Sequence, residues 1–145
     1  MTFTYRDSHL PAGTVVTRVA MRLRKGEAAE VSSKLRELVG KRKSSQPSGF
    51  PNSGSMFRNP PGDYAGRLIE AAGLKGKRVG QAQIAERHGN FIVNLGGAKA
   101  DDVRQLMDLA RAEVKRQFGV ELIAEVKLMG EWEESELTTR GTKVM

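Results

Sequence analysis

The chain has 145 residues, of which 39% are hydrophobic, enough for one domain with a lean packed core. It has no cysteine, which excludes disulfides and thiolate metal sites and favours a reducing compartment. The formal net charge is +7, with 15 Lys and Arg against 6 Asp and Glu in residues 1–80, so we expect an anionic partner, either nucleic acid or a phosphorylated or carboxylated ligand.

The first predicted elements are a strand and a helix. Residues 14–24 alternate between hydrophobic side chains and arginines, which is typical of a strand with one exposed face. The hydrophobic residues that follow recur at helical spacing: Val31, Leu35, Leu38 and Val39. We expect Gly40 to end this helix, and residues 41–55, rich in serine, glycine and proline, to form a long loop.

Two further helices are predicted. The first begins after Asp63, whose side chain can cap it, and ends at Gly73. The second and longest runs from about Asp101 to Phe118, has acidic residues in its first turn and is closed by Gly119.

Three more strands complete the pattern. Residues 77–85 and 91–95 are predicted to pair through the polar turn at 86–90, and residues 120–130 form a last alternating strand. In that strand the expected core row is Val120, Leu122, Ala124, Val126 and Leu128. A hairpin in the middle of mixed helices and strands favours an α+β layer over a doubly wound parallel sheet.

Nucleic-acid binding and membrane insertion find little support in the sequence. The basic clusters at 40–43 and 75–78 could contact phosphates, but aromatic residues for base stacking are not interleaved with them. We therefore interpret most of these cations as a solvated rim. No apolar run approaches the ~20 residues of a membrane span, and we expect no secretory leader.

Ser55 is the first candidate for chemistry, and local sequence leaves two interpretations open. A serine in a loop rich in glycine and proline is commonly a turn residue whose hydroxyl bonds the nearby backbone. A loop stiffened by these residues could also position the hydroxyl for reaction. A catalytic triad is not predicted, because "SGSMF" departs from the G-x-S-x-G pattern and only His9 and His88 could act as the base.

Glu125 is the second candidate. It lies opposite the hydrophobic row of the last predicted strand, on a face shared with Ile123 and Met129. A carboxylate on such a mixed face can be half-buried and have a perturbed pKa, although a solvated strand face fits equally well. Arg6, in "TYRDS", is unremarkable when taken alone.

Several short motifs, taken in order, resemble the carboxy-terminal part of the MurB family, the UDP-N-acetylenolpyruvoylglucosamine reductases. The motifs are "YRDS", "KRKSSQP", "SGSMFRNPPG", "AGRLIEAAGLKGKRVGQAQIAERHGNFIVN", "AKADDV" and "FGVELIAEVKLMG". The resemblance covers about residues 4–130. It implies an α+β fold in which helices pack on a small mixed or antiparallel sheet. Residues 1–45 would be the last strand and helix of an FAD-binding domain, 46–130 the substrate-binding domain, and 131–145 a flexible tail.

The resemblance also implies a reaction. Members of the family use NADPH and FAD to reduce the enolpyruvyl group of a UDP-sugar to UDP-N-acetylmuramate, a cytoplasmic step of peptidoglycan synthesis. By motif, Ser55 matches the proton donor, and Arg6 and Glu125 match the residues that stabilise the enolic intermediate. Arg6 also counts as a cofactor-binding residue. The expected substrate-binding residues are Asn59, Arg58 and His88, and no metal is expected.

Two departures from the family pattern limit this expectation. Arg58 stands where lysine is more frequent, which keeps the charge but changes the geometry of the donors. More seriously, the family's glycine-rich FAD-binding sequence lies upstream of "YRDS" and is absent from this chain. We therefore expect the chain alone to be inactive and its partner to be the missing amino-terminal FAD-binding half. The alternatives are a non-catalytic basic module for nucleic acid and a degenerate fragment.

Overall fold

The computed structural model describes residues 2–132. The chain divides into two compact units between Leu35 and Arg36. The tail predicted from residue 131 lies outside the described residues from 133 onward. The elements in order are α1 (Ala28–Ser45), β1 (Asn52–Ser55), α2 (Ala65–Ala71), β2 (Arg78–Val79), β3 (Ala82–Ile84), β4 (Phe91–Asn94) and α3 (Ala100–Phe118).

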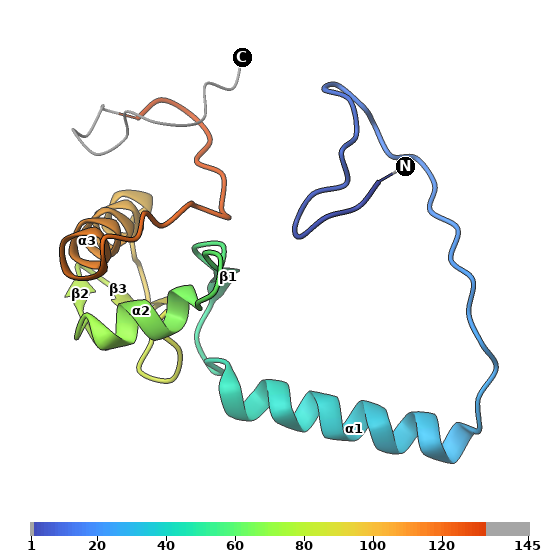
Figure 1. The fold of residues 1–145 in the computed structure, drawn as a ribbon. Helices are drawn as coiled ribbons and strands as arrows, with labels where there is room; N and C mark the ends of the chain where they lie inside the picture. Colours follow the sequence, from blue (N-terminus) through green and yellow to red (C-terminus); the bar gives the residue numbers. More distant parts are fainter. Residues whose placement is uncertain (1, 133–145) are drawn as a thin grey trace. The chain divides into compact units, whose positions relative to one another are not determined.

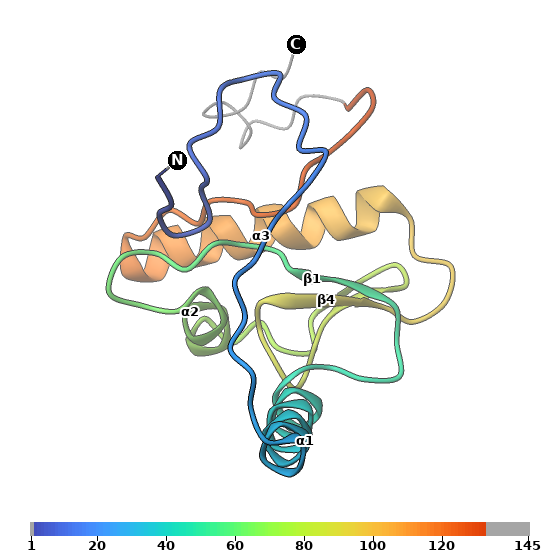
Figure 2. The ribbon, with the colours of Figure 1, turned by 90° about the vertical axis from the view of Figure 1, so that its right-hand side faces the viewer.

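An antiparallel four-stranded sheet in the order β1-β4-β3-β2 organises the second unit. α2 and α3 pack with one face of the sheet, as Figures 1 and 2 show. Because side chains alternate along a strand, Ile92 enters this main core while Phe91 and Val93 join a small cluster on the other face. This arrangement confirms the predicted α+β class.

The longest predicted helix is confirmed at both ends. At its start, the Asp102 carboxylate accepts a hydrogen bond from the backbone N–H of Lys99 at 2.9 Å. At its end, Gly119 has a φ of 69°, and its N–H donates to the Lys115 carbonyl. These local signals, together with a regular hydrophobic stripe, explain why the sequence located α3 correctly.

The hairpin prediction needs one correction. Residues 77–85 form two short strands rather than one, because the chain reverses at Gly80 and pairs Val79 with Ala82. Gly80 has a φ of 51°, which suits the first position of a two-residue hairpin turn. β3 then pairs with β4, as expected for the second half of the predicted strand.

The predicted loop at 41–55 is also wrong at both ends. Helix α1 continues through Gly40 to Ser45, and the loop ends in strand β1. An interior glycine costs a helix only about 1 kcal/mol relative to alanine, so it does not by itself stop one. Here Lys41 pairs with Glu37 at 2.7 Å, and the hydroxyl of Ser45 donates to the Lys41 carbonyl at 2.8 Å.

Two predicted strands do not form. Residues 14–24 have no regular secondary structure and no hydrogen-bonded strand partner within residues 2–132, and their hydrophobic side chains are exposed. Alternation indicates which face of a strand would be buried, but a strand also needs a neighbour to satisfy its backbone.

Residues 120–130 make only a single bridge, between Ala124 and Phe57. Most of the predicted core row is confirmed: Leu122 is buried, and Val120, Ala124 and Val126 pack against the core. Leu128 is 45% exposed and does not belong to the row, since the bridge ends well before it.

The glycines of α1 and α3 allow a matched test of these helix ends. Neither a Cβ at Gly40 nor one at Gly119 would meet a neighbouring atom, but only Gly119 has a positive φ. We expect Gly40→Ala to stabilise α1 by about 1 kcal/mol and Gly119→Ala to destabilise the chain by about 1 kcal/mol. Circular dichroism and hydrogen exchange measure both effects. Equal effects of the two variants would contradict the assignment of Gly119 as the helix end.

Candidate functional site

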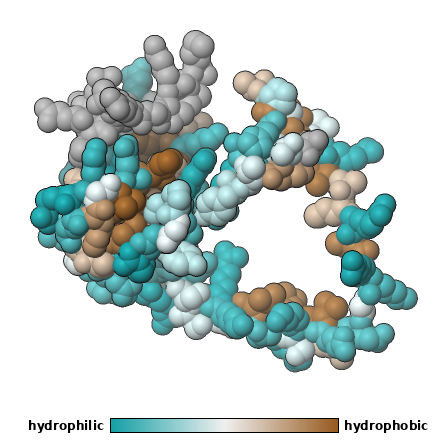
Figure 3. Space-filling model, in the orientation of Figure 1, coloured by the Kyte–Doolittle hydropathy of each residue, from teal (hydrophilic) through white to brown (hydrophobic). Residues whose placement is uncertain are grey.

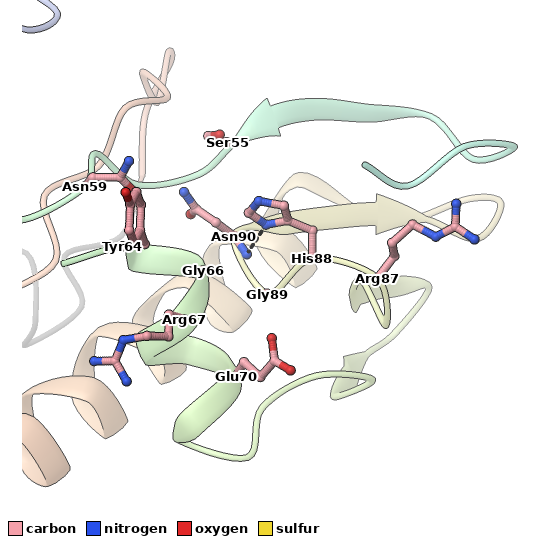
Figure 4. A pocket seen from close by; sticks show the side chains of 10 residues that line it. All are labelled: Ser55, Asn59, Tyr64, Gly66, Arg67, Glu70, Arg87, His88, Gly89 and Asn90. Atoms are coloured by element: carbon pink, nitrogen blue, oxygen red, sulfur yellow. Dashed lines mark hydrogen bonds between the residues drawn. The ribbon is translucent and has the colours of Figure 1, made fainter. Parts of the chain in front are cut away.

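A cavity of about 380 Å³ lies between the end of β1, the first turns of α2 and residues 87–90. Three residues singled out in the sequence line it: Ser55, Asn59 and His88. Figure 4 shows His88 and Asn90 between Ser55 on one side and α2 on the other. The structure therefore brings together residues that are up to 33 positions apart in the chain.

Ser55 is the last residue of β1 and not, as predicted, part of an irregular loop. It is half-buried and pairs with Phe91 of β4. The next residue, Met56, donates its N–H to the Asn90 carbonyl at 3.0 Å. Within residues 2–132 the Ser55 hydroxyl makes no hydrogen bond, so the local turn bond that the sequence left open is not formed.

Asn59 is exposed, and its Oδ1 accepts the N–H of Ala65, the first residue of α2, at 3.1 Å. The prediction gave this capping role to Asp63. Asp63 instead accepts the N–H of Tyr64 at 2.6 Å and pairs with Arg67. The hydrogen bond from Arg67, followed by that from Tyr64, lowers the pKa of Asp63 to about 2.

His88 is half-buried with a defined ring orientation. Its Nδ1 accepts the backbone N–H of Asn90 at 3.2 Å, and its ring contacts Phe91 edge to face at 4.8 Å between centroids. Burial is the main cause that lowers the pKa of His88, and the positive charge of Lys75 adds to it, whereas Glu70 opposes it. A neutral imidazole carries one N–H, so the Nδ1 acceptor places the proton on Nε2.

Two glycines allow α2 to approach the His88 segment closely. A Cβ at Gly66 would lie 2.7 Å from Cε1 of His88, and one at Gly89 would lie 2.7 Å from the carbonyl oxygen of Gly66. The helix backbone therefore forms part of the cavity wall. Any larger residue at these positions would push the two walls apart.

The charged residues near the cavity are mostly engaged with the protein. Arg87 donates to the carbonyl of Lys43 at 2.9 Å, and in Figure 4 its side chain points away from the other labelled residues. Lys75 forms an ion pair with Glu70 at 2.9 Å. Lys75, one residue of the predicted solvated rim, therefore makes a specific contact.

Two other predicted site residues of the second unit, Arg58 and Glu125, do not line the cavity. Arg58 is exposed, and its backbone N–H donates to the Ile123 carbonyl at 2.9 Å. Glu125 is half-buried and donates its N–H to the Met56 carbonyl at 2.8 Å, which places its backbone beside the residue after Ser55. Arg6 belongs to the first unit, where its guanidinium lies 5.8 Å from the centre of the Tyr5 ring.

Sequence reasoning missed Asn90, which is only 3% exposed. It was assigned to a polar turn, and nothing local in "RHGNF" indicates burial. Gly66 and Gly89 were missed too, since their importance depends on a contact between distant segments.

A cavity of about 380 Å³ is at the small end for ligand pockets, which span roughly 300–1,000 Å³. Between residues 2 and 132, no cluster of three or more His, Asp or Glu side chains could hold a metal ion. In the same part of the chain, no helix is both long enough and apolar enough to cross a bilayer.

Comparison with known proteins gives consistent matches. Residues 46–129 match the family described as "UDP-N-acetylenolpyruvoylglucosamine reductase, C-terminal domain". UDP-N-acetylenolpyruvoylglucosamine reductase 2 of Symbiobacterium thermophilum is 54% identical over 129 residues, which are 88% of this chain and 42% of that protein. The corresponding reductase of Anaeromyxobacter dehalogenans strain 2CP-C is 53% identical over 135 residues, 93% of this chain and 41% of that protein.

A solved structure gives the same picture. The crystal structure of UDP-N-acetylenolpyruvylglucosamine reductase (MurB) from Thermus caldophilus matches with a TM-score of 0.70 and 47% identity. The match covers 83% of this chain and 43% of that one. The chain therefore spans about two fifths of the length of the curated relatives it matches.

His88 provides a test of the site through pH. Because its pKa is lowered in the folded chain, the unfolded chain binds a proton first as the pH falls through about 6.5. We expect the free energy of unfolding to decrease below that pH, and the His88→Gln variant to lose this part of the dependence. Urea unfolding at several pH values measures it. A dependence that His88→Gln leaves unchanged would contradict a buried, neutral His88.

Proposed function

Because the chain belongs to the family of UDP-N-acetylenolpyruvoylglucosamine reductases, matching its C-terminal domain, we propose that it supplies the substrate-binding end of that reductase in cytoplasmic peptidoglycan synthesis. The observation that carries the proposal is the cavity that joins Ser55, Asn59 and His88. These three residues come from a strand end, a helix cap and a turn, and the resemblance assigns a role to each.

Ser55 is the proton donor of the proposed reaction. A serine hydroxyl is a weak acid, but the carbon of an enolic intermediate is a strong enough base to take its proton if the two are well aligned. The main-chain bond from Met56 to Asn90 and the pairing of Ser55 with β4 contribute to that alignment. The hydroxyl is thereby held beside a cavity rather than on a mobile loop.

Arg6 and Glu125 have the complementary role in the proposal. Negative charge develops on the substrate carboxylate when the enolic intermediate forms, and donors aimed at that charge are commonly worth a few kcal/mol. Arg6 supplies a permanent positive charge that opposes it. Glu125 would have to donate through a carboxylic acid O–H, and its backbone is bonded to Met56, next to Ser55. Arg6 also belongs to the cofactor side of the site.

Substrate recognition is assigned to the polar donors around the cavity. The Nε2–H of His88 and the Nδ2 of Asn59, whose Oδ1 is used by α2, suit the oxygen-rich groups of a UDP-sugar. Arg58 is exposed and adds positive charge beside Asn59 in the sequence. The positive charge of residues 1–80 fits a substrate that bears a diphosphate and a carboxylate.

FAD and NADPH belong to the proposed enzyme, but their sites lie mainly in the part of the relatives that this chain lacks. Bound FAD would supply reducing equivalents to the substrate. The proposed partner is a polypeptide carrying that part. Hydrophobic side chains gather along one side of α1 in Figure 3. Leu35 of this helix is 60% exposed. We assign the cover of this surface, and of the exposed side chains at 14–24, to the proposed FAD-binding partner.

Removal of the Ser55 hydroxyl tests the assignment. The chain is joined to the amino-terminal part of the Symbiobacterium relative so that the assembly binds flavin. We expect Ser55→Ala to slow flavin reoxidation by the UDP-sugar about 10²–10⁴-fold, the usual range for a general acid, while reduction by NADPH stays at the parent rate. Stopped-flow absorbance measures both steps. Ser53→Ala is the control, and equal loss of both steps would mark Ser55 as structural.

The chain without its partner gives a separate test. We expect the purified 145-residue chain to lack stoichiometric flavin and to show no NADPH-dependent reduction of the UDP-sugar, because the family's glycine-rich FAD-binding sequence does not occur in it. Absorbance at roughly 450 nm measures the flavin content, and the oxidation of NADPH measures turnover. Yellow, active protein would contradict the proposed division between two parts.

A further inference from the structure

Asn90 is a polar side chain in the core, and both ends of its amide are used. Its Oδ1 accepts the N–H of Phe57 at 2.9 Å, and its Nδ2 donates to the carbonyl of the same residue at 2.7 Å. Asn90 is 3% exposed and Phe57 is 2% exposed, so the pair is shielded from water. The side-chain amide therefore pairs with the backbone of Phe57 as a neighbouring strand would, accepting one hydrogen bond and donating another.

The backbone of Asn90 extends the same contact to both sides of the cavity. Its carbonyl accepts the N–H of Met56, and its N–H donates to Nδ1 of His88. One residue thus contacts the segment between Ser55 and Asn59 and also determines which nitrogen of His88 carries the proton.

Strand pairing alone leaves the orientation of Ser55 poorly defined. The register between β1 and β4 shifts between Asn52 and Ser55, where β1 contains an extra residue, and Gly54 has a φ of 83°. A shift of one residue would turn every following side chain to the opposite face. Burial of Met56 and Phe57 stabilises the core, but hydrophobic burial is non-directional and does not fix the orientation of the backbone. The two hydrogen bonds between Asn90 and Phe57 are directional and form in one register of this segment only.

We propose that Asn90 is a positioning residue: its side-chain amide fixes the Phe57 peptide and thereby the direction in which Ser55 and Asn59 face the cavity. The inference rests on the proposed function for the chemistry of Ser55. The geometric part concerns this chain alone and can be tested without turnover.

The Asn90→Asp variant gives the sharpest test in the 145-residue chain. A carboxylate can accept the Phe57 N–H but cannot donate to the Phe57 carbonyl, and burial raises the pKa of such a group. Once protonated, its O–H donates again. We expect the backbone amide resonances of residues 55–59 to match the parent at low pH and to move away as the pH rises, with a titration that the parent lacks.

Two further variants separate this effect from a general loss of stability. Asn94→Asp changes the last residue of β4, whose Oδ1 accepts the N–H groups of Gly96 and Ala98. A carboxylate can accept both bonds, so we expect no titration at residues 55–59. Asn90→Leu keeps the size but removes both bonds, and we expect the Phe57 amide to exchange at least about tenfold faster. The titratable neighbours His88, Glu70 and Glu125 are present in every variant, so they contribute equally.

Each outcome of these measurements supports or contradicts the proposal. Parent-like resonances at residues 55–59 in Asn90→Asp at every pH, or the same titration in Asn94→Asp, overturn the proposal. If Asn90→Asp folds only at low pH, the comparison at that pH still tests the proposal. The resonances of residues 55–59 must then match the parent in Asn90→Asp and differ from the parent in Asn90→Leu. In the completed enzyme, we expect Asn90→Asp to slow flavin reoxidation by the UDP-sugar at least tenfold at high pH, and less at low pH.

The positioning role of Asn90 and the proposed function can be contradicted independently of each other. If the resonances titrate but the completed enzyme reduces no UDP-sugar, the proposed function is wrong while the positioning role stands. If the enzyme acts on the UDP-sugar and Asn90→Asp behaves as the parent in both measurements, the positioning role is wrong while the function stands.

Discussion

Residues 56–58 are bonded along both edges, and the rest of the cavity is built around that short segment. On one edge Asn90 holds Met56 and Phe57 through its backbone and its side chain. On the other edge the carbonyl of Met56 accepts the N–H of Glu125. Ser55 precedes this segment and Asn59 follows it, so the same constraint places the strand end and the cap of α2.

The wall of the cavity that α2 forms depends on the absence of side chains at two glycines rather than on a hydrogen bond. Gly66 and Gly89 let the backbone of α2 come against the turn that carries His88. This contact shields the imidazole, and the resulting loss of solvent favours its neutral form. A donor at Nε2 is thus a consequence of close packing and of the bond from Asn90 to Nδ1. The electrostatics of the site follow from its packing.

Local signals predicted those parts of the structure that local interactions determine. α3 has a regular stripe, an acidic first turn and a terminal glycine, and each acts within a few residues. The strand expected at 14–24 failed because its pattern requires a partner that the described residues do not provide. β1 was missed because "NSGS" has low strand propensity and pairs only because β4 is beside it. Ser55 was a candidate from its own loop, Asn59 and His88 were named by resemblance, and Asn90, 33 positions from Phe57, had no local signature.

The two units differ in whether they can bury a core of their own, and this difference bears on the proposed division of function. The second unit encloses its main hydrophobic cluster between a sheet and two helices, and the cavity belongs entirely to it. No residue between 2 and 35 is buried, so the ordering of that segment is not offset by hydrophobic burial within the unit. The segment that carries Arg6 needs another surface before it can be held in place, while Ser55 and its supports do not. If the proposed function holds, the cavity can therefore exist before Arg6 is fixed, and assembly with the proposed partner would be the step that joins substrate binding to reaction.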